Sequence, residues 1–264
     1  MKIENKNVII TGAASGLGKQ LTIQMLAKGA KVAAIDINEA NLKALKKEVG
    51  SKNIKTYVVN MANREEIKEF KTKYLKDFKD VDILINNAGI IQPFVYVEDL
   101  DEATIDRVMN VNFFGPLFLV KEFVKDFKDD AKEQYIVNIA SMGGFFPFPF
   151  QTIYGASKAA LKLFSEGLYS ELKMYNDKVM IVFPGAINTN ITQNSNVKME
   201  KSADESNYKM LEADVAAAKI IKAIEKNKFK LYLGKDAKML KRLYRFNSKM
   251  AIDIVTKNIV KKLK

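Results

Sequence analysis

The chain has 264 residues, and 43 Lys and Arg against 31 Asp and Glu give it a formal net charge of +12. It contains no Cys, His or Trp. These absences exclude disulfide bonds, metal sites built on Cys or His, and nucleophilic triads that need an imidazole or a thiolate. Proton transfer near neutral pH must then use a carboxylate, a Lys, a Tyr or water.

Strand and helix patterns alternate along the chain. Short apolar runs predict buried strands at 8–10, 31–35, 54–59, 82–85, 135–139, 179–183 and 229–232. Apolar residues at helical spacing predict helices between them at 16–28, 39–49, 64–78, 102–127, 152–175 and 213–225. Strands that are apolar on both faces and separated by helices indicate a parallel sheet covered on both sides. We therefore predict an α/β fold, a Rossmann-type doubly wound parallel sheet in a single three-layer α/β/α domain.

The start of the sequence shows neither the apolar stretch nor the small-residue cleavage site of a signal peptide. No run of about 18 uncharged apolar residues, the length that spans a bilayer, occurs in the chain. We expect a cytoplasmic protein.

A glycine-rich loop, TGAASGLG at 11–18, lies between the first predicted strand and the first predicted helix. Glycines let the backbone approach a pyrophosphate, and the free N–H groups at the helix start stabilise its charge. A tight turn without a ligand is the alternative. The candidate cofactor residues of this loop are Gly12, Ser15, Gly16, Leu17 and Gly18.

Asp36 ends the second predicted strand, about 20 residues beyond the glycine loop. A carboxylate there can accept hydrogen bonds from both adenosine ribose hydroxyls and would repel a 2′-phosphate. The neighbouring Ser15 and Ile37 carry no charge that could bind that phosphate. The position favours NAD(H) and makes NADP(H) the less favoured cofactor, unless Asp36 is only a solvated turn residue.

Tyr154 and Lys158 lie four residues apart at the start of a predicted helix, which places them on one face. An ammonium at this distance favours the phenolate, so we expect it to lower the pKa of Tyr154. This is the best acid–base arrangement that a chain without His offers, although such pairs also occur as simple surface pairs.

These motifs occur in a fixed order with NNAG at 86–89, Asn112 in VNFFG, Ser141 thirteen residues before Tyr154, and PGAINT at 184–189. Together they resemble the short-chain dehydrogenase/reductase family over roughly residues 5–235. The resemblance implies an enzyme that interconverts an alcohol and a ketone or aldehyde by hydride transfer, with no metal.

The resemblance also implies the roles of four catalytic residues. Tyr154 would be the general acid and base, and Lys158 would hold the nicotinamide ribose and keep Tyr154 acidic. Ser141 would donate a hydrogen bond to the substrate oxygen. Asn112 would hold, through its backbone, a water that links Lys158 to solvent.

Further cofactor positions follow from the same resemblance. The NNAG turn would support the adenosine side, and PGAINT would seat the nicotinamide, with the Ile187 backbone and the Thr189 hydroxyl on its carboxamide. Asn60 and Met61 stand where the family commonly has Asp and Val, so we expect adenine binding of altered strength. These positions are Asn60, Met61, Asn87, Ala88, Gly89, Pro184, Gly185, Ile187 and Thr189.

Four phenylalanines between Ser141 and Tyr154 suggest an apolar substrate, either lipid-like or polycyclic, and Phe94 could join them. Phe145 and Phe148 are the candidate substrate contacts. The alternative is that these rings pack in the core or at a subunit contact.

We predict that residues 1–234 form the cofactor-binding catalytic domain, including a polar substrate loop at 188–211. Residues 235–264 hold ten basic and two acidic residues, a net +8, and predict an amphipathic helical extension. It would pack on the domain or on a sister subunit, or bind an anionic membrane surface peripherally. No nucleic-acid recognition module is visible.

The resemblance further implies a homo-oligomer, a dimer or a tetramer, built through the helices at 102–127 and 152–175. Three alternatives to the NAD(H)-dependent enzyme stay open. They are an NADP(H)-dependent carbonyl reductase, an epimerase or dehydratase with tightly bound NAD, and a non-catalytic cofactor-binding sensor. The chain is short for an epimerase or dehydratase.

Overall fold

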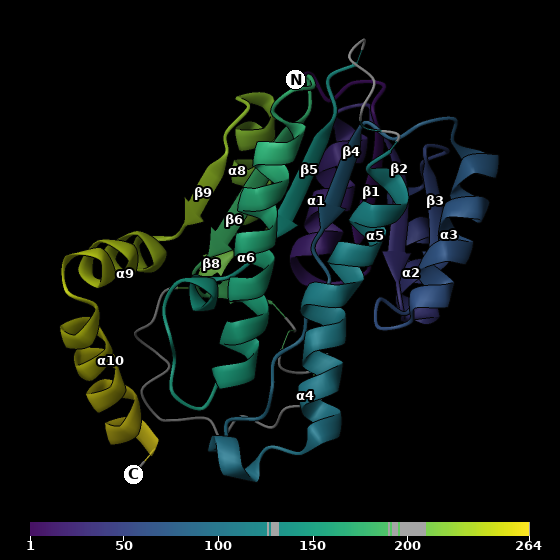
Figure 1. Ribbon diagram of the computed structural model, residues 1–264. Helices are drawn as coiled ribbons and strands as arrows, with labels where there is room; N and C mark the ends of the chain where they lie inside the picture. Colours follow the sequence, from purple (N-terminus) through teal and green to yellow (C-terminus); the bar gives the residue numbers. More distant parts are fainter. Residues whose placement is uncertain (126, 128–131, 190, 192–194, 196–209, 264) are drawn as a thin grey trace.

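A computed structural model describes residues 1–125, 127, 132–189, 191, 195 and 210–263 (Figure 1). Its centre is a parallel sheet of seven strands in the order β3-β2-β1-β4-β5-β6-β9. The reversal of strand order at β1 and β4 confirms the doubly wound fold. The strands are β1 (Asn7–Thr11), β2 (Lys31–Asp36), β3 (Ile54–Val58), β4 (Ile83–Asn86), β5 (Tyr135–Ile139), β6 (Lys178–Pro184) and β9 (Lys230–Leu233).

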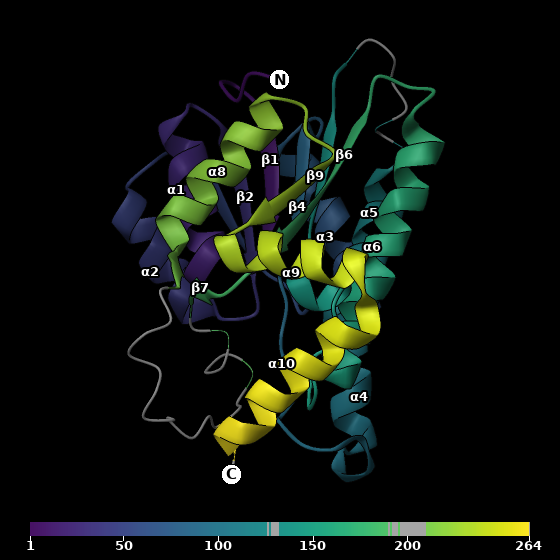
Figure 2. The ribbon, with the colours of Figure 1, turned by 90° about the vertical axis from the view of Figure 1, so that its left-hand side faces the viewer.

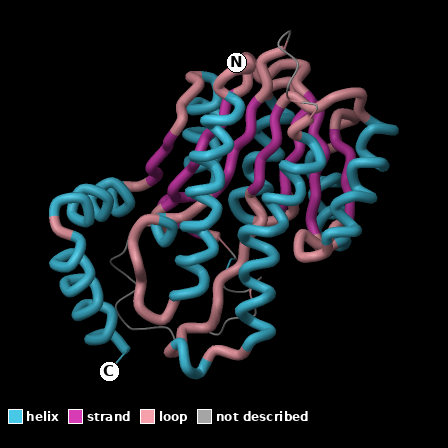
Figure 3. The backbone as a smooth tube through the Cα atoms, viewed as in Figure 1, coloured by secondary structure: helices cyan, strands magenta, loops and turns pink. Residues whose placement is uncertain are grey.

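Helices cover both faces of the sheet and complete three layers (Figures 1 and 3). One face carries α1 (Gly16–Ala27), α2 (Glu39–Val49) and α8 (Ala213–Glu225). The other face carries α3 (Arg64–Asp77), α5 (Gly115–Phe123) and α6 (Thr152–Leu172). Beyond the carboxyl ends of the strands lie α4 (Glu102–Met109) and α10 (Ser248–Leu263), in the lower part of Figure 1, and α9 (Lys235–Phe246), at its left side.

The alternation of side chains along each strand explains why the sheet needs two helical layers. In β1, Val8 and Ile10 are buried in the core beneath α1 and α8, whereas Ile9 is buried in the core beneath α3 and α5. Successive side chains of a strand point to opposite faces, so an uninterrupted apolar run must be covered twice.

The helix predicted at 102–127 is present as one continuous helical run over 102–123, but it is not α-helical throughout. It is divided into α4, a π-helical turn η2 (Asn110–Phe114) and α5. Pro116 has no N–H to donate to the carbonyl of Asn112, and its ring would clash with that carbonyl in a regular α-helix. The widened turn instead lets the Gly115 N–H donate to the carbonyl of Asn110. A Cβ at Gly115 would overlap the carbonyl oxygen of Met61, so only glycine fits there.

The single amphipathic helix predicted for residues 235–264 is also divided. The backbone of Asn247 is extended (φ −152°, ψ 105°), and its side-chain oxygen accepts a hydrogen bond from the Met250 N–H. Asn is a favoured helix N-cap, so Asn247 ends α9 and starts α10. Figure 2 shows α9 and α10 meeting at this bend. Among the described helices, none is long and apolar enough to cross a bilayer.

Short strands lie at the two ends of the polar segment predicted as a substrate loop at 188–211. The two-residue strands β7 (Ile187–Asn188) and β8 (Leu211–Glu212) pair in parallel at its two ends. Most of the segment between them lies outside the described residues. Two 3₁₀ turns, η1 (Val97–Asp99) and η3 (Met142–Gly144), complete the described elements.

Candidate active site

Many of the predicted site residues end or follow strands of the sheet, and they gather at one edge of it. The glycine loop follows β1, Asp36 ends β2, and the NNAG turn follows β4. Ser141 follows β5, and Pro184 ends β6. These strands are parallel, so their carboxyl ends lie at the same edge of the sheet. In doubly wound sheets, ligands usually bind at this edge, next to the point where the strand order reverses.

The glycine loop and the NNAG turn are held together by hydrogen bonds. The Thr11 hydroxyl accepts from the backbone N–H groups of Asn87 and Ala88, at 3.0 Å each. The Asn87 side chain donates to the carbonyls of Thr11 (3.0 Å) and Gly12 (3.2 Å). Gly12 has φ +62°, and a Cβ there would lie 2.9 Å from the Ala88 Cα. A larger residue would separate the two segments.

Asp36 is held against the glycine loop. Its Oδ2 accepts from the Ala14 N–H and its Oδ1 accepts from the Asn38 N–H, both at 3.0 Å. These bonds fix the carboxylate at the loop, and each oxygen keeps a second lone pair for a ligand. The next residue, Ile37, is 65 % exposed.

Ser141, Tyr154 and Lys158 come together beyond the end of β5. The Ser141 hydroxyl hydrogen-bonds to the Tyr154 phenol and accepts from the Gly143 N–H at 3.1 Å. A Cβ at Gly143 would lie 3.3 Å from the Tyr154 ring, so this glycine lets η3 and α6 approach closely. The ammonium of Lys158 donates to the Ile139 carbonyl at 3.1 Å.

Burial dominates the electrostatics of these groups. Desolvation raises the pKa of Tyr154 above its ordinary value of 10.0, and the hydrogen bond from Ser141 opposes this only in part. The expected lowering of this pKa by Lys158 is therefore wrong, because burial raises it. Burial also lowers the pKa of Lys158 to about 8, because a buried ammonium loses its hydration.

Asn112 is fully buried in the π-helical turn, and both its side-chain oxygen and its side-chain nitrogen form hydrogen bonds. Its Oδ1 accepts from the Ile90 N–H, and its Nδ2 donates to the Ile90 carbonyl, both at 2.9 Å. It also donates to the Ser157 hydroxyl at 3.0 Å. A Cβ at Gly89 would lie 3.0 Å from the Lys158 Nζ and 3.2 Å from the Asn112 Oδ1. Asn112 therefore lies beside the lysine, separated from it by a glycine backbone.

Asn60 and Met61 follow β3 at the same edge. The Asn60 side-chain oxygen already accepts from the Ala62 N–H at 2.9 Å, and the Asn60 N–H donates to Glu66 at 2.7 Å. One lone pair of that oxygen is therefore used within the protein. Met61 is 7 % exposed and belongs to the core on the α3 side of the sheet.

The segment expected to seat a nicotinamide lies against the glycine loop. A Cβ at Gly16 would be 3.1 Å from the Thr189 Cβ, and Gly16 has φ +49°. Gly185 donates to the Leu233 carbonyl at 2.9 Å, and the Ile187 backbone is held in β7. Leu17 and Gly18 are buried at the start of α1, where a Cβ at Gly18 would overlap the Gly12 carbonyl.

Sequence reasoning missed Asp236, which holds this segment from the C-terminal side. The Asp236 Oδ2 accepts from the Ala186 N–H at 2.8 Å. Its carboxylate occupies the space that a Cβ at Gly185 or Gly234 would need. Asp236 lies 50 residues beyond Ala186, in the predicted C-terminal extension at 235–264. No local sequence pattern therefore indicates that it contacts the site.

Sequence reasoning also missed Gln92, a fully buried residue after the NNAG turn. Its side-chain oxygen accepts from the N–H groups of Ile153 (2.8 Å) and Tyr154 (2.9 Å) at the first turn of α6. Its amide donates to the Phe150 carbonyl at 3.1 Å. Gln151 in turn donates to the Gln92 carbonyl at 2.9 Å. Gln92 therefore caps the helix that carries Tyr154 and Lys158.

The phenylalanines after Ser141 pack mainly within the fold. The Phe145 ring contacts Phe183 (5.6 Å between centroids) and Tyr232 (5.7 Å). Phe146 is 1 % exposed and lies between Phe148 (5.0 Å) and Tyr244 of α9 (5.5 Å). Core packing accounts for Phe145 and Phe146, whereas Phe148 remains half-buried at the edge of this cluster.

The chain matches the family described as short chain dehydrogenase over residues 6–200. It belongs to the short-chain dehydrogenase/reductase family. It is 37 % identical over 205 residues to the 3-oxoacyl-[acyl-carrier-protein] reductase FabG of Thermotoga maritima, a match that covers 77 % of this chain and 82 % of that protein.

Solved structures of the family share the fold. A short-chain dehydrogenase/reductase from Burkholderia phymatum in complex with NAD has a TM-score of 0.86 at 21 % identity, covering 95 % of this chain and 96 % of the other. A short-chain dehydrogenase from Burkholderia cenocepacia J2315 in complex with NADP has a TM-score of 0.81 at 24 % identity, covering 97 % and 99 %. As a member of this family, the chain is an NAD(P)-dependent oxidoreductase that acts on CH–OH donors.

Proposed function

We propose that the enzyme uses NAD(H) to interconvert an apolar alcohol and its ketone or aldehyde, with Tyr154 as general acid and base. The observation that carries this proposal is the group formed by Ser141, Tyr154 and Lys158. The Ser141–Tyr154 hydrogen bond and the buried Lys158 ammonium lie together beyond the end of β5.

The residues at the carboxyl edge of the sheet fit a dinucleotide. Gly12 and Gly16, both with positive φ, let the glycine loop pack closely against Ala88 and Thr189, which gathers the three predicted cofactor segments. The start of α1 directs N–H groups and partial positive charge toward a pyrophosphate. Asp36 would hold the adenosine ribose, and Asn60 and Met61 would border the adenine. The NNAG turn would support this side, and Pro184, Gly185, Ile187 and Thr189 would hold the nicotinamide.

When bound, the cofactor gives or takes a hydride at the carbonyl carbon. In reduction, Ser141 donates a hydrogen bond to the substrate oxygen as negative charge grows on it. Tyr154 then donates its phenolic proton to that oxygen, and in oxidation it takes the proton back. Burial raises the pKa of Tyr154, which keeps its phenol protonated and able to donate in the reduction direction.

Asn112 would help to return protons to this pair from solvent. Pro116 cannot donate to the Asn112 carbonyl, so that oxygen lacks its usual α-helical partner. We propose that it holds a water next to Lys158, while the side-chain bonds to Ile90 and Ser157 keep the turn in place.

The choice of NAD(H) rests on Asp36. Its carboxylate is fixed at the glycine loop, and neither Ser15 nor Ile37 offers a positive charge to a 2′-phosphate. We expect kcat/KM for NADH to exceed that for NADPH, and the double variant Asp36→Ser/Ile37→Arg to reverse this order. A native enzyme that prefers NADPH would contradict the assignment and leave the NADP(H)-dependent carbonyl reductase.

The apolar substrate is supported by Met142 and Phe148, which follow Ser141 in the chain and remain half-buried at the edge of an apolar cluster. The relative from Thermotoga maritima, named for a 3-oxoacyl substrate, points to the same chemical class. Kinetics on a series of ketones of rising chain length test this. We expect kcat/KM to rise with chain length, and a flat series would contradict an apolar site. The variant Phe148→Ala should flatten the series.

We also propose a homo-oligomer built through α4–α5 and α6. Leu163 of α6 is 68 % exposed and Phe114 of η2 is 38 % exposed, so both elements present apolar side chains outward. Sedimentation velocity should show a dimer or a tetramer that the variant Leu163→Lys dissociates. A native monomer would contradict this assembly.

A further inference from the structure

Helix α9 has two apolar faces, and the fold uses only one of them. Its inner face carries Ala237 and Leu240, both buried, and Tyr244, which packs on Phe146. Lys241 also turns inward, with its ammonium 3.9 Å from the centre of the Tyr232 ring. These contacts fix α9 to the domain and thereby determine which side of the helix faces outward.

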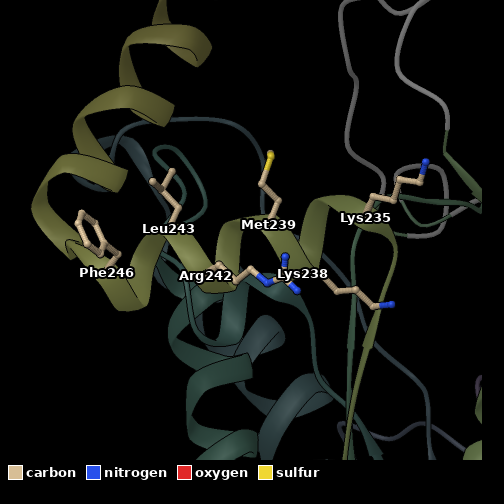
Figure 4. Close-up of a pocket in the computed structure, with 6 residues that line it drawn as sticks. All are labelled: Lys235, Lys238, Met239, Arg242, Leu243 and Phe246. Carbon is tan, nitrogen blue, oxygen red and sulfur yellow. The ribbon is translucent and has the colours of Figure 1, made fainter.

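The other side of α9, which we call the outer face, combines exposed apolar side chains with basic ones. Met239 is 66 % exposed and Phe246 is 84 % exposed, with the half-buried Leu243 between them. Together with three exposed cations they line a shallow groove of about 490 Å³. Figure 4 shows the six residues along one helix: Lys235, Lys238, Met239, Arg242, Leu243 and Phe246.

The spacing of these residues makes the outer face a continuous stripe. They recur at intervals of three and one, which keeps them on one side of an α-helix. On α10, beyond the bend, Met250 is 37 % and Ile254 is 42 % exposed. A large side chain such as Phe246, left in water next to basic groups, is a feature of surfaces that bind a partner.

The charge of the stripe indicates the kind of partner. Lys235, Lys238 and Arg242 are exposed, and the one acid of α9, Asp236, is directed to the Ala186 N–H of the domain. A symmetric contact with a second copy would bring two such cationic stripes together, which like-charge repulsion disfavours. An anionic surface that also accepts apolar side chains satisfies both features of the stripe.

We propose that the outer face of α9 docks on an anionic lipid membrane. Met239 and Phe246 enter the boundary between headgroups and acyl chains, while Lys235, Lys238 and Arg242 lie at the level of the phosphates. The inner face of the same helix packs on the Phe146 loop next to Ser141, so docking places the candidate active site near the membrane. The proposal concerns only the surface and is independent of the reaction.

Co-sedimentation of the full chain with vesicles tests this. We compare pure phosphatidylcholine vesicles with vesicles that contain 30 mol % phosphatidylglycerol, at low salt. The native protein should bind only the anionic vesicles. The double variant Lys238→Gln/Arg242→Gln should lower the partition coefficient about 25-fold, since each surface cation contributes roughly a factor of five. The double variant Met239→Ser/Phe246→Ser should lower it about tenfold or more.

Matched controls separate the stripe from total charge and total hydrophobicity. Lys46→Gln/Lys47→Gln removes two exposed charges from α2, and Leu75→Ser/Met174→Ser removes two exposed apolar side chains elsewhere. Both control variants should bind as the native protein does, and circular dichroism should show that all variants fold.

Three results would overturn the proposal. The first is a native protein that does not bind anionic vesicles, and the second is an equal loss of binding in the controls. The third is a fall in oligomer size in the α9 variants with vesicle binding unchanged, which would assign the stripe to a second copy.

Discussion

Gln92 offers a sharp test of how the catalytic helix is positioned. Replacing it with Met keeps the approximate volume but removes the side-chain oxygen that accepts from the Ile153 and Tyr154 N–H groups. A buried donor without a partner costs about 1–3 kcal/mol, so two of them cost roughly 2–6 kcal/mol. Relaxation of the first turn of α6 would relieve part of this cost, and it would move Tyr154.

We expect Gln92→Met to lower kcat roughly 100-fold, the loss that a displacement of about 1 Å causes at a reacting group. The KM for NADH should stay within about threefold, because the described hydrogen bonds of the Gln92 side chain involve only Phe150 and the start of α6. Steady-state NADH oxidation measures both constants, and urea unfolding measures the stability loss.

Two further variants separate positioning from general damage. A protonated carboxyl at position 92 can accept from both N–H groups and donate to the Phe150 carbonyl, so Gln92→Glu should recover activity as the pH falls. Gln24→Met removes one hydrogen bond at the surface and should change nothing. If Gln92→Met kept its kcat within twofold, or lost kcat and NADH binding equally, the positioning role would be refuted.

Two other predictions concern Asp236 and Lys158. Asp236→Ala removes the acceptor for the Ala186 N–H and should raise the KM for NADH about tenfold with a smaller change in kcat. Asp236→Asn can still accept this hydrogen bond and should keep a KM close to the native value. Equal KM values for the two variants would contradict the role of Asp236 in holding this segment. Because burial lowers the pKa of Lys158 to about 8 from 10.5, the unfolded chain holds a proton there that the folded chain releases. The free energy of unfolding should therefore rise from pH 8 to 10, by about 2–3 kcal/mol more in the native protein than in Lys158→Met, and identical pH profiles would contradict the shift.

Local patterns predicted the sheet and the order of the site well. Apolar runs and helical spacing predicted the strands and most helix boundaries to within a few residues, because the inner strands of the sheet are buried on both faces. The motifs at the strand ends also came together, since parallel strands bring their carboxyl ends to one edge.

The failures came where distant contacts decide the structure. The π-helical turn within 102–127 depends on Pro116 and on the approach of Gly115 to Met61, more than fifty residues earlier. The roles of Gln92 and Asp236 depend on partners about 60 and 50 residues away. The pKa of Tyr154 depends on burial, which the four-residue spacing from Lys158 does not reveal.

We propose that Tyr154 transfers the proton, while the other site residues bind and position the cofactor and the substrate. The variant Tyr154→Phe removes one hydroxyl and leaves the ring and the glycine loop in place. We predict that steady-state oxidation of NADH with a good ketone substrate falls at least about 100-fold, while NADH titration gives a Kd within threefold of the native value. Native turnover in Tyr154→Phe would contradict the mechanism.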